Sequence, residues 1–163
     1  MAEWGSRVVG YAHFLTGDAS VAQDIAQEAF LRLYVFLGSH RGQAPTAGWL
    51  MTVAKHLAAD ESRRRRREWA MTDAQSLERG SDAMREDLAD RPLVRDALSR
   101  LAPEDQECLY LFYYADLSSQ EIARHLKVPA ATVRTRLMRA RQRFRGEWTQ
   151  EGRGDRDGDG DAR

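Results

Sequence analysis

The chain of 163 residues is long enough for one domain or two small ones, and its 25 basic and 25 acidic residues balance to a formal charge of zero. With 42% hydrophobic and 31% charged residues it has an ordinary soluble composition, and its single cysteine excludes an internal disulfide and a cysteine-based zinc site. No apolar run reaches the ~20 residues of a membrane span and the N-terminus lacks a signal-peptide pattern, so we expect a cytoplasmic protein without membrane insertion.

The neutral total conceals two basic segments. Residues 101–123 carry five acidic residues and no lysine or arginine, whereas residues 124–145 carry eight basic residues and no acidic one. The other basic segment is the run of five arginines at 63–67. Two such segments on a neutral chain indicate a polyanion bound at two defined places rather than a general coating of charge.

Hydrophobic residues follow a helical period along the chain, and the alternation typical of strands is nearly absent, which predicts an all-α fold. We expect a first helix over about 8–15, ended by Gly17, and a second over about 19–37, capped by Asp18. The second helix has a broad apolar face, made of Val21, Ile25, Ala26, Ala29, Phe30, Leu33, Phe36 and Leu37.

Three further apolar residues of the second helix, Leu31, Tyr34 and Val35, fall on its polar side. A solvated face does not favour large apolar side chains. Two interpretations therefore remain open: these residues thicken the core, or they form a face that docks a partner.

Residues 38–45 have the composition of a loop, after which Thr46 can cap a third helix. We expect its inner face to hold Trp49, Leu50, Val53 and Leu57. The helix continues into the arginines at 63–67. Five successive residues cannot all face one way on a helix, so we expect these arginines to place positive charge all around it. The alternative is a flexible basic tail.

The middle of the chain predicts a boundary between two small helical domains. Residues 71–91 hold few large apolar side chains among Ser, Asp, Gly and Arg, which favours a flexible linker. Pro92 then opens a helical segment through Leu101, and the Gly-, Asp- and Arg-rich end of the chain is expected to be disordered. The predicted ranges are two domains at 1–70 and 92–147, the linker at 71–91, and a tail at 148–163.

A helix-turn-helix is predicted in the second domain. Ser118 and Glu121 have the spacing of a capping box before a short helix. Lys127 and the next residue form a turn, and Pro129 suits the first turn of the following helix. That helix has a narrow apolar stripe, made of Val133, Leu137, Ala140 and Phe144. We therefore expect a four-helix domain that binds duplex DNA.

The outer face of this last helix carries residues suited to DNA. The residues expected to reach base edges in the major groove are Arg134, Thr135, Met138 and Arg139. Those expected to neutralise phosphates on the flanks are Arg136, Arg141, Arg143 and Arg145. The alternative is a basic surface helix within a helical bundle.

Two separate motif groups now resemble a known family. Residues 98–109 (LSRLAPEDQECL), 117–123 (LSSQEIA) and 128–141 (VPAATVRTRLMRAR) resemble the promoter-reading C-terminal domain of extracytoplasmic-function sigma factors, in the sigma-70 family. In the first half, residues 15–30 (LTGDASVAQDIAQEAF) and 49–60 (WLMTVAKHLAAD) look like the family's polymerase-binding helix and the helix after it. The resemblance covers about residues 7–145.

The resemblance implies a function and its partners. The second helix would dock on the clamp helices of the largest subunit of core RNA polymerase, through Asp24, Gln27, Glu28, Leu31 and Val35. The second domain would read the minus-35 element as duplex, and polymerase contact would extend to the flap. The single-stranded minus-10 element, with a flipped base, would be held by His40, Arg41, Trp49, Lys55, His56, Arg63 and Arg64. The family's usual regulator is an anti-sigma factor.

The alternatives belong to other classes of protein. The four histidines have no metal-ligand spacing and no phosphate loop or nucleophile motif occurs, so no catalytic, metal or cofactor site is predicted. A two-component-type regulator has a similar helix-turn-helix output domain and binds duplex DNA without polymerase. Such regulators usually carry an α/β receiver domain, whereas the first 70 residues here contain no strand pattern.

Overall fold

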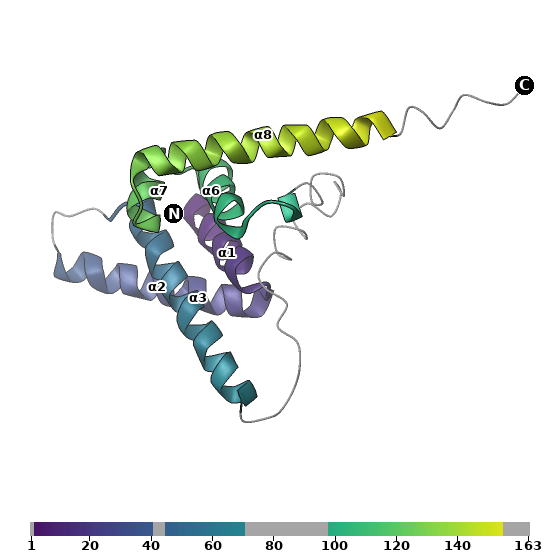
Figure 1. The fold of residues 1–163 in the computed structure, drawn as a ribbon. Helices are drawn as coiled ribbons and strands as arrows, with labels where there is room; N and C mark the ends of the chain where they lie inside the picture. Colours follow the sequence, from purple (N-terminus) through teal and green to yellow (C-terminus); the bar gives the residue numbers. More distant parts are fainter. Residues whose placement is uncertain (1, 41–44, 71–97, 155–163) are drawn as a thin grey trace, which may run out of the picture.

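The computed structural model describes residues 2–40, 45–70 and 98–154, and each regular element in these ranges is an α-helix (Figure 1). An N-terminal unit contains α1 (Ala2–Thr16), α2 (Ala19–Ser39) and α3 (Ala47–Ala70). A C-terminal unit contains α6 (Pro103–Tyr113), α7 (Ser119–Leu126) and α8 (Ala130–Gly154). The all-α prediction is confirmed. The linker predicted at 71–91 lies outside the described residues.

The junction between α1 and α2 forms as its sequence predicts. Gly17 adopts a φ of 69°, and the Asp18 carboxylate accepts a hydrogen bond from the Val21 amide at 3.1 Å. This bond satisfies an amide that the first turn of α2 leaves without a helical partner. α1 begins at Ala2, earlier than the predicted start near Val8.

The apolar face of α2 is shorter than predicted. Ala22, Ile25, Ala26 and Ala29 are buried, but Leu37 is 48% exposed, so its assignment to the inner face is wrong. These four buried residues all lie in the first half of α2.

The buried face of α3 is rotated from the prediction. Leu50, Met51, Ala54 and Ala58 are buried, whereas the predicted inner residues Trp49, Val53 and Leu57 are only partly buried against the same core. The reason is tertiary: α3 contacts α1 and α2 and also α7 from the other unit. The prediction is therefore confirmed for Leu50, and it holds in part for Trp49, Val53 and Leu57, which pack against the core without being fully buried.

The arginine run at 63–67 continues α3, so the flexible-tail alternative is wrong for it. Arg65 donates to Asp18 at the start of α2, at 2.9 Å, and also to Glu61. The Glu61 carboxylate also accepts from Arg64 at 2.8 Å. The Arg65–Asp18 bond joins the extended end of α3 to the N-terminus of α2, whereas the bonds to Glu61 lie within α3.

The C-terminal unit contains the predicted helix-turn-helix. The Ser118 hydroxyl accepts from the Glu121 amide at 3.3 Å, and the Glu121 carboxylate accepts from the Ser118 amide at 2.9 Å, which completes the capping box. Lys127 turns the chain with a left-handed φ of 55°. In α8, Val133, Leu137 and Ala140 are buried and Phe144 is partly buried. The predicted apolar stripe is confirmed.

α8 is longer than predicted. It runs to Gly154 instead of ending near Arg145, so the start of the predicted disordered tail at 148 is wrong. Figure 1 shows α8 along one edge of the molecule, extending past α6. Residues 155–163 lie outside the described part of the chain.

Lys127 provides a test of the turn. A left-handed backbone costs a residue with a Cβ atom about 1 kcal/mol, and glycine avoids this cost. We expect Lys127→Gly to raise the free energy of unfolding by up to about 1 kcal/mol in urea titrations. Lys127→Ala is the control, because it removes the charge and keeps the Cβ atom. An equal gain in both variants would contradict the strain argument.

Candidate nucleic-acid interface

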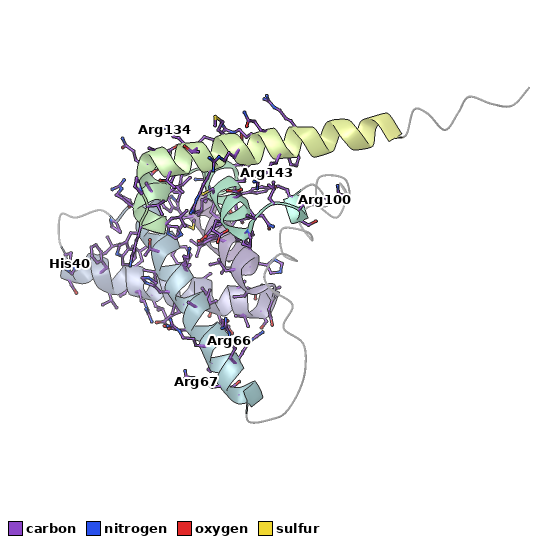
Figure 2. All side chains as sticks on the ribbon, in the orientation of Figure 1. His40, Arg66, Arg67, Arg100, Arg134 and Arg143 are labelled. Atoms are coloured by element: carbon purple, nitrogen blue, oxygen red, sulfur yellow. The ribbon has the colours of Figure 1, made fainter. Side chains whose placement is uncertain are left out.

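The structure brings the predicted base-reading residues together on one surface. Arg134, Thr135, Met138 and Arg139 are all exposed on α8, opposite its buried stripe, and Met138 is 52% exposed. Figure 2 places Arg134 near the start of α8. The Thr135 hydroxyl donates to the Ala131 carbonyl at 3.0 Å, which holds its methyl group and oxygen in place. A convex basic helix of this kind fits the major groove.

The predicted phosphate-binding arginines divide into two groups by their contacts. Arg141 donates to the Tyr113 hydroxyl at 2.9 Å and lies over the Phe112 ring, 5.1 Å from its centroid. Arg143 lies 3.5 Å from the Asp105 carboxylate with a side chain that stays 59% exposed. Arg136 is partly buried and Arg145 is exposed. Arg141 and Arg136 therefore also support packing on α6, where Arg136 contacts Cys108, while Arg143 and Arg145 keep exposed side chains that a ligand can reach.

The predicted minus-10 residues are dispersed over α2 and α3. His40 stacks on Phe36 with ring centroids 4.4 Å apart, and Trp49 packs on the same Phe36 ring at 5.1 Å. These three rings gather where α2 ends and α3 begins. Arg41 lies outside the described residues.

The remaining members of that set lie along α3. His56 is exposed, and Lys55 donates to Glu107 of the C-terminal unit at 2.7 Å. Arg63 pairs with Asp60, and Arg64 pairs with Glu61 and Glu68. Figure 2 shows Arg66 and Arg67 near the far end of α3, where Arg66 donates to the Ser62 hydroxyl and Arg67 donates to the Arg63 carbonyl of the same helix. Within residues 2–40, 45–70 and 98–154, Arg66 and Arg67 are the arginines of the run that form no salt bridge, and we did not select them from the sequence.

The polar side of α2 carries an apolar groove. Leu31, Tyr34 and Val35 are 61%, 78% and 64% exposed, so the interpretation that they thicken the core is wrong. The groove is lined by Val9 of α1 and, on α2, by Gln23, Ala26, Gln27, Phe30, Leu31, Leu33, Tyr34 and Leu37. Of the predicted polymerase-binding set, Gln27 and Leu31 line this groove. Asp24, Glu28 and Val35 lie beside it on α2.

A polar network that sequence analysis missed connects the two units. It joins five side chains from four helices: Tyr11, Thr52, Lys55, Glu107 and His125, called the interunit network below. The Tyr11 hydroxyl lies 2.5 Å from Glu107 Oε1 and 2.7 Å from His125 Nε2. Thr52 Oγ1 lies 3.0 Å from His125 Nδ1. Its members are up to 114 positions apart in sequence, so no local spacing marks them.

Hydrogen bonds run through the interunit network from α3 to α6. The Thr52 hydroxyl donates to the Gly48 carbonyl at 2.7 Å and its oxygen also contacts His125 Nδ1. Tyr11 donates to Glu107, and its oxygen contacts His125 Nε2. Lys55 supplies a second donor to the same carboxylate. The hydrogen-bonded chain therefore ends at the Glu107 carboxylate, and the Lys55 ammonium group balances its negative charge.

The charges in the interunit network shift two pKa values. Burial acts to raise the pKa of Glu107, but contacts with His125, Lys55 and Tyr11 outweigh it and lower the pKa to about 2. Burial and the nearby Glu107 charge raise the pKa of Tyr11 well above its usual value. Both shifts keep Glu107 charged and Tyr11 protonated near neutral pH.

Residues 2–40, 45–70 and 98–154 also bear on metal binding and membrane insertion. These ranges contain no group of three or more His, Cys, Asp or Glu side chains that could hold a metal ion. None of their helices is long and apolar enough to cross a membrane. Cys108 is buried, and burial raises the pKa of its thiol.

Both halves of the chain match family models. Residues 1–68 match sigma-70 region 2, and residues 91–144 match sigma-70, region 4. The chain is 33% identical over 156 residues to the RNA polymerase sigma-H factor of Pseudomonas aeruginosa, covering 83% of this chain and 80% of that one. It is 34% identical over 145 residues to the ECF RNA polymerase sigma factor BldN of Streptomyces coelicolor, covering 85% of this chain. It spans about half of BldN, 54% of its length.

Solved structures share the fold. The sigma factor RpoE from Bartonella quintana, in complex with the anti-sigma factor NepR, matches with a TM-score of 0.64 at 19% identity. That match covers 90% of this chain and 92% of the other. CnrH, in complex with the cytosolic domain of CnrY, matches with a TM-score of 0.63 at 21% identity, covering 91% and 84% of the two chains.

The Glu107 carboxylate makes the free energy of unfolding depend on pH in the acidic range. Its pKa falls from 4.5 to about 2, so its contribution is fully present above pH 4.5 and is lost as the pH falls toward 2. That contribution is on the order of 3 kcal/mol. We expect Glu107→Gln to lower the thermal midpoint at pH 7 and to flatten its decline between pH 4.5 and 2.

The matched control is Glu104→Gln, at an exposed position of α6. The thermal midpoint of Glu104→Gln should decline between pH 4.5 and 2 as it does in the wild type. Part of the slope should survive in Glu107→Gln as well, because hydrogen bonds from the Val21 amide and Arg65 lower the Asp18 pKa. If the thermal midpoint of Glu107→Gln declined between pH 4.5 and 2 as steeply as that of the wild type, the Glu107 carboxylate would not be a cause of the acid dependence.

Proposed function

The chain belongs to the sigma-70 family of RNA polymerase sigma factors, in the extracytoplasmic-function group, and from this membership we propose that it binds core RNA polymerase and directs it to a specific set of promoters. The observation that carries the proposal is the pairing of a region 2 match with a region 4 match in one chain. In this proposal the N-terminal unit binds polymerase and the minus-10 element, and the C-terminal unit binds the minus-35 element. Both partners would place the protein in the cytoplasm.

In the C-terminal unit, α8 is the proposed reader of the minus-35 duplex. Arg134 and Arg139 can each donate two hydrogen bonds to the N7 and O6 atoms of a guanine. Thr135 and Met138 offer apolar contact to thymine methyl groups beside them. Arg143 and Arg145 reach the phosphates and set the register of the helix on the duplex.

In the N-terminal unit, the aromatic cluster of Phe36, His40 and Trp49 is the proposed site for a minus-10 base. A flipped base loses stacking worth a few kcal/mol, which stacking on an aromatic side chain can offset. Arg66 and Arg67 of α3 are better placed to meet DNA phosphates than Arg63 and Arg64, whose guanidinium groups already pair with acids. This assignment revises our sequence-based choice within the arginine run.

The groove on α2 is the proposed polymerase-docking surface. A helix laid into it would cover the exposed side chains of Leu31 and Tyr34, and burial of a leucine side chain contributes roughly 2 kcal/mol. We also propose that an anti-sigma factor uses this groove. Inhibition would then arise because the two partners exclude each other.

A two-component-type regulator was the alternative interpretation of the sequence. Its helix-turn-helix output domain would explain α7 and α8. It would not explain residues 1–68, which match sigma-70 region 2. A pull-down with purified core RNA polymerase tests the choice, because a sigma factor requires stable binding to polymerase and such a regulator does not.

We expect substitutions on α8 to separate base reading from phosphate binding. Arg134→Ala should weaken binding to a duplex selected by the wild-type protein by roughly 10- to 100-fold, with little effect on unrelated duplex. Arg143→Ala should weaken binding to both and reduce the slope of log K against log salt by about 0.9. Fluorescence anisotropy over a salt series measures both effects. Gln142→Ala, an exposed neutral neighbour, is the control; a selective loss from Arg143→Ala would reverse the two assignments.

On α2, we expect Leu31→Asp to reduce affinity for core polymerase by about tenfold or more, since it places a charge in the apolar groove. The thermal midpoint should change little, because the side chain is 61% exposed. Ser20→Asp, at an exposed position in the first turn of α2, is the control. Equal polymerase affinity for the two variants would place the docking surface elsewhere.

A further inference from the structure

The arginine run of α3 presents less uncompensated charge than its sequence suggests. Its five arginines lie beside four acidic residues that pair with them, namely Asp60, Glu61 and Glu68 on α3 and Asp18 at the start of α2. In the described part of the chain, the positive charge of the run is therefore almost balanced where it lies. Three of the five arginines must exchange an acidic partner for a phosphate before they can bind DNA.

Glu61 lies at the centre of these pairs. Arg64 donates to both oxygens of its carboxylate, from Nε at 2.9 Å and from Nη2 at 2.8 Å, and Arg65 donates from Nε at 2.9 Å. The Glu61 side chain is only 17% exposed, whereas that of Arg64 is 59% exposed. Hydrogen bonds from Arg64 and Arg65 lower the pKa of Glu61, so the carboxylate stays charged near neutral pH.

The pair of Arg64 and Glu61 has the geometry of an arginine bound to phosphate. A carboxylate and a phosphate each offer two oxygens to the planar guanidinium, which binds either of them through two parallel hydrogen bonds. The Nε and Nη2 groups of Arg64 can therefore bind Glu61 or a phosphate, but not both at once. The third nitrogen, Nη1, donates to Glu68 at 2.9 Å.

Stability is a weak explanation for the ion pairs around the run. Ion pairs between side chains exposed to water contribute little to the free energy of unfolding. Among the pairs that the described residues form here, Arg65–Asp18 joins two helices, and the others connect residues three or four positions apart within α3. Their main effect is therefore on the charge that α3 presents to a ligand.

We propose that Glu61 is an intramolecular competitor of DNA phosphate, which occupies Arg64 and limits the phosphate contacts of the run to Arg66 and Arg67. A DNA strand then gains little affinity from charge alone at this surface. Binding at the minus-10 element depends more on contacts with its bases, which favours selection by sequence. The inference rests on the proposed function for the identity of that element, whereas the competition can be measured on any single strand.

Salt dependence tests the competition in the full chain. Each phosphate contact on a single strand adds about 0.7 to the slope of log K against log salt. We expect Glu61→Gln to steepen this slope by about 0.7, because Arg64 becomes able to hold one phosphate. Affinity should rise by about fivefold at roughly 0.1 M salt, and the gain should vanish toward about 1 M. Fluorescence anisotropy with a fluorescein-labelled single-stranded oligonucleotide of mixed sequence measures both effects.

Two further variants separate competition from a change in net charge. Glu104→Gln removes the same charge from an exposed position of α6 and should keep the wild-type slope. Arg64→Gln should change the slope little when Glu61 is present, because the arginine then binds no phosphate. In the Glu61→Gln background, the same substitution should remove the gain of about 0.7. Binding of the oligonucleotide to α8 is common to all these variants and cancels in the comparison.

The outcomes separate the competition from the proposed function. An unchanged slope in Glu61→Gln would overturn the competition, as would equal effects of Arg64→Gln in the two backgrounds. If circular dichroism shows that Glu61→Gln does not fold, Asp60→Asn takes its place, because this acid and its partner Arg63 are 68% and 65% exposed. An unchanged slope there would overturn the competition equally. Absence of polymerase binding by the wild-type chain would overturn the proposed function, while the slopes would still test Glu61.

Discussion

The relation between the two units depends on one buried carboxylate. Glu107 has a side chain only 14% exposed, and a charged group in such a position is costly unless donors surround it. Two of its donors come from the other unit, Tyr11 from α1 and Lys55 from α3, and His125 of its own unit lies 3.8 Å away. Because the C-terminal unit does not supply the first two donors, the carboxylate favours the packing of α6 and α7 on α1 and α3. That packing in turn decides which parts of α3 face solvent.

α8 has two faces with different physical roles. Its inner stripe, with Val133 and Leu137, fixes the helix to the C-terminal unit by burial. Its outer residues make few contacts within the chain, so their hydrogen-bonding groups remain available for DNA. Arg141 lies between the two faces, where the Phe112 and Tyr113 rings and the Tyr113 hydroxyl hold its guanidinium. Arg141 therefore contributes both to packing on α6 and to the positive charge of α8. Substituting it would change both contributions at once.

Exposed apolar groups on α2 line a groove beside Val9 of α1. Leu31, Tyr34 and Leu37 are 61%, 78% and 48% exposed there. Such side chains favour association with another helix. The groove that we assign to polymerase therefore offers exposed apolar surface to a partner, while the buried residues of α2 lie between Ala22 and Ala29.

Features that depend on residues three or four positions apart could be predicted from the sequence. The Asp18 cap, the Ser118–Glu121 capping box and the apolar stripe of α8 are local, because neighbouring turns of a helix bring their members together whatever the rest of the fold does. The tertiary structure decided the rest. Lys55 matched a DNA-binding motif, but its partner Glu107 is 52 positions away and comes within reach only when α3 packs on α6. No local spacing encodes a contact between units, since the long-range packing of helices determines which side chains meet there.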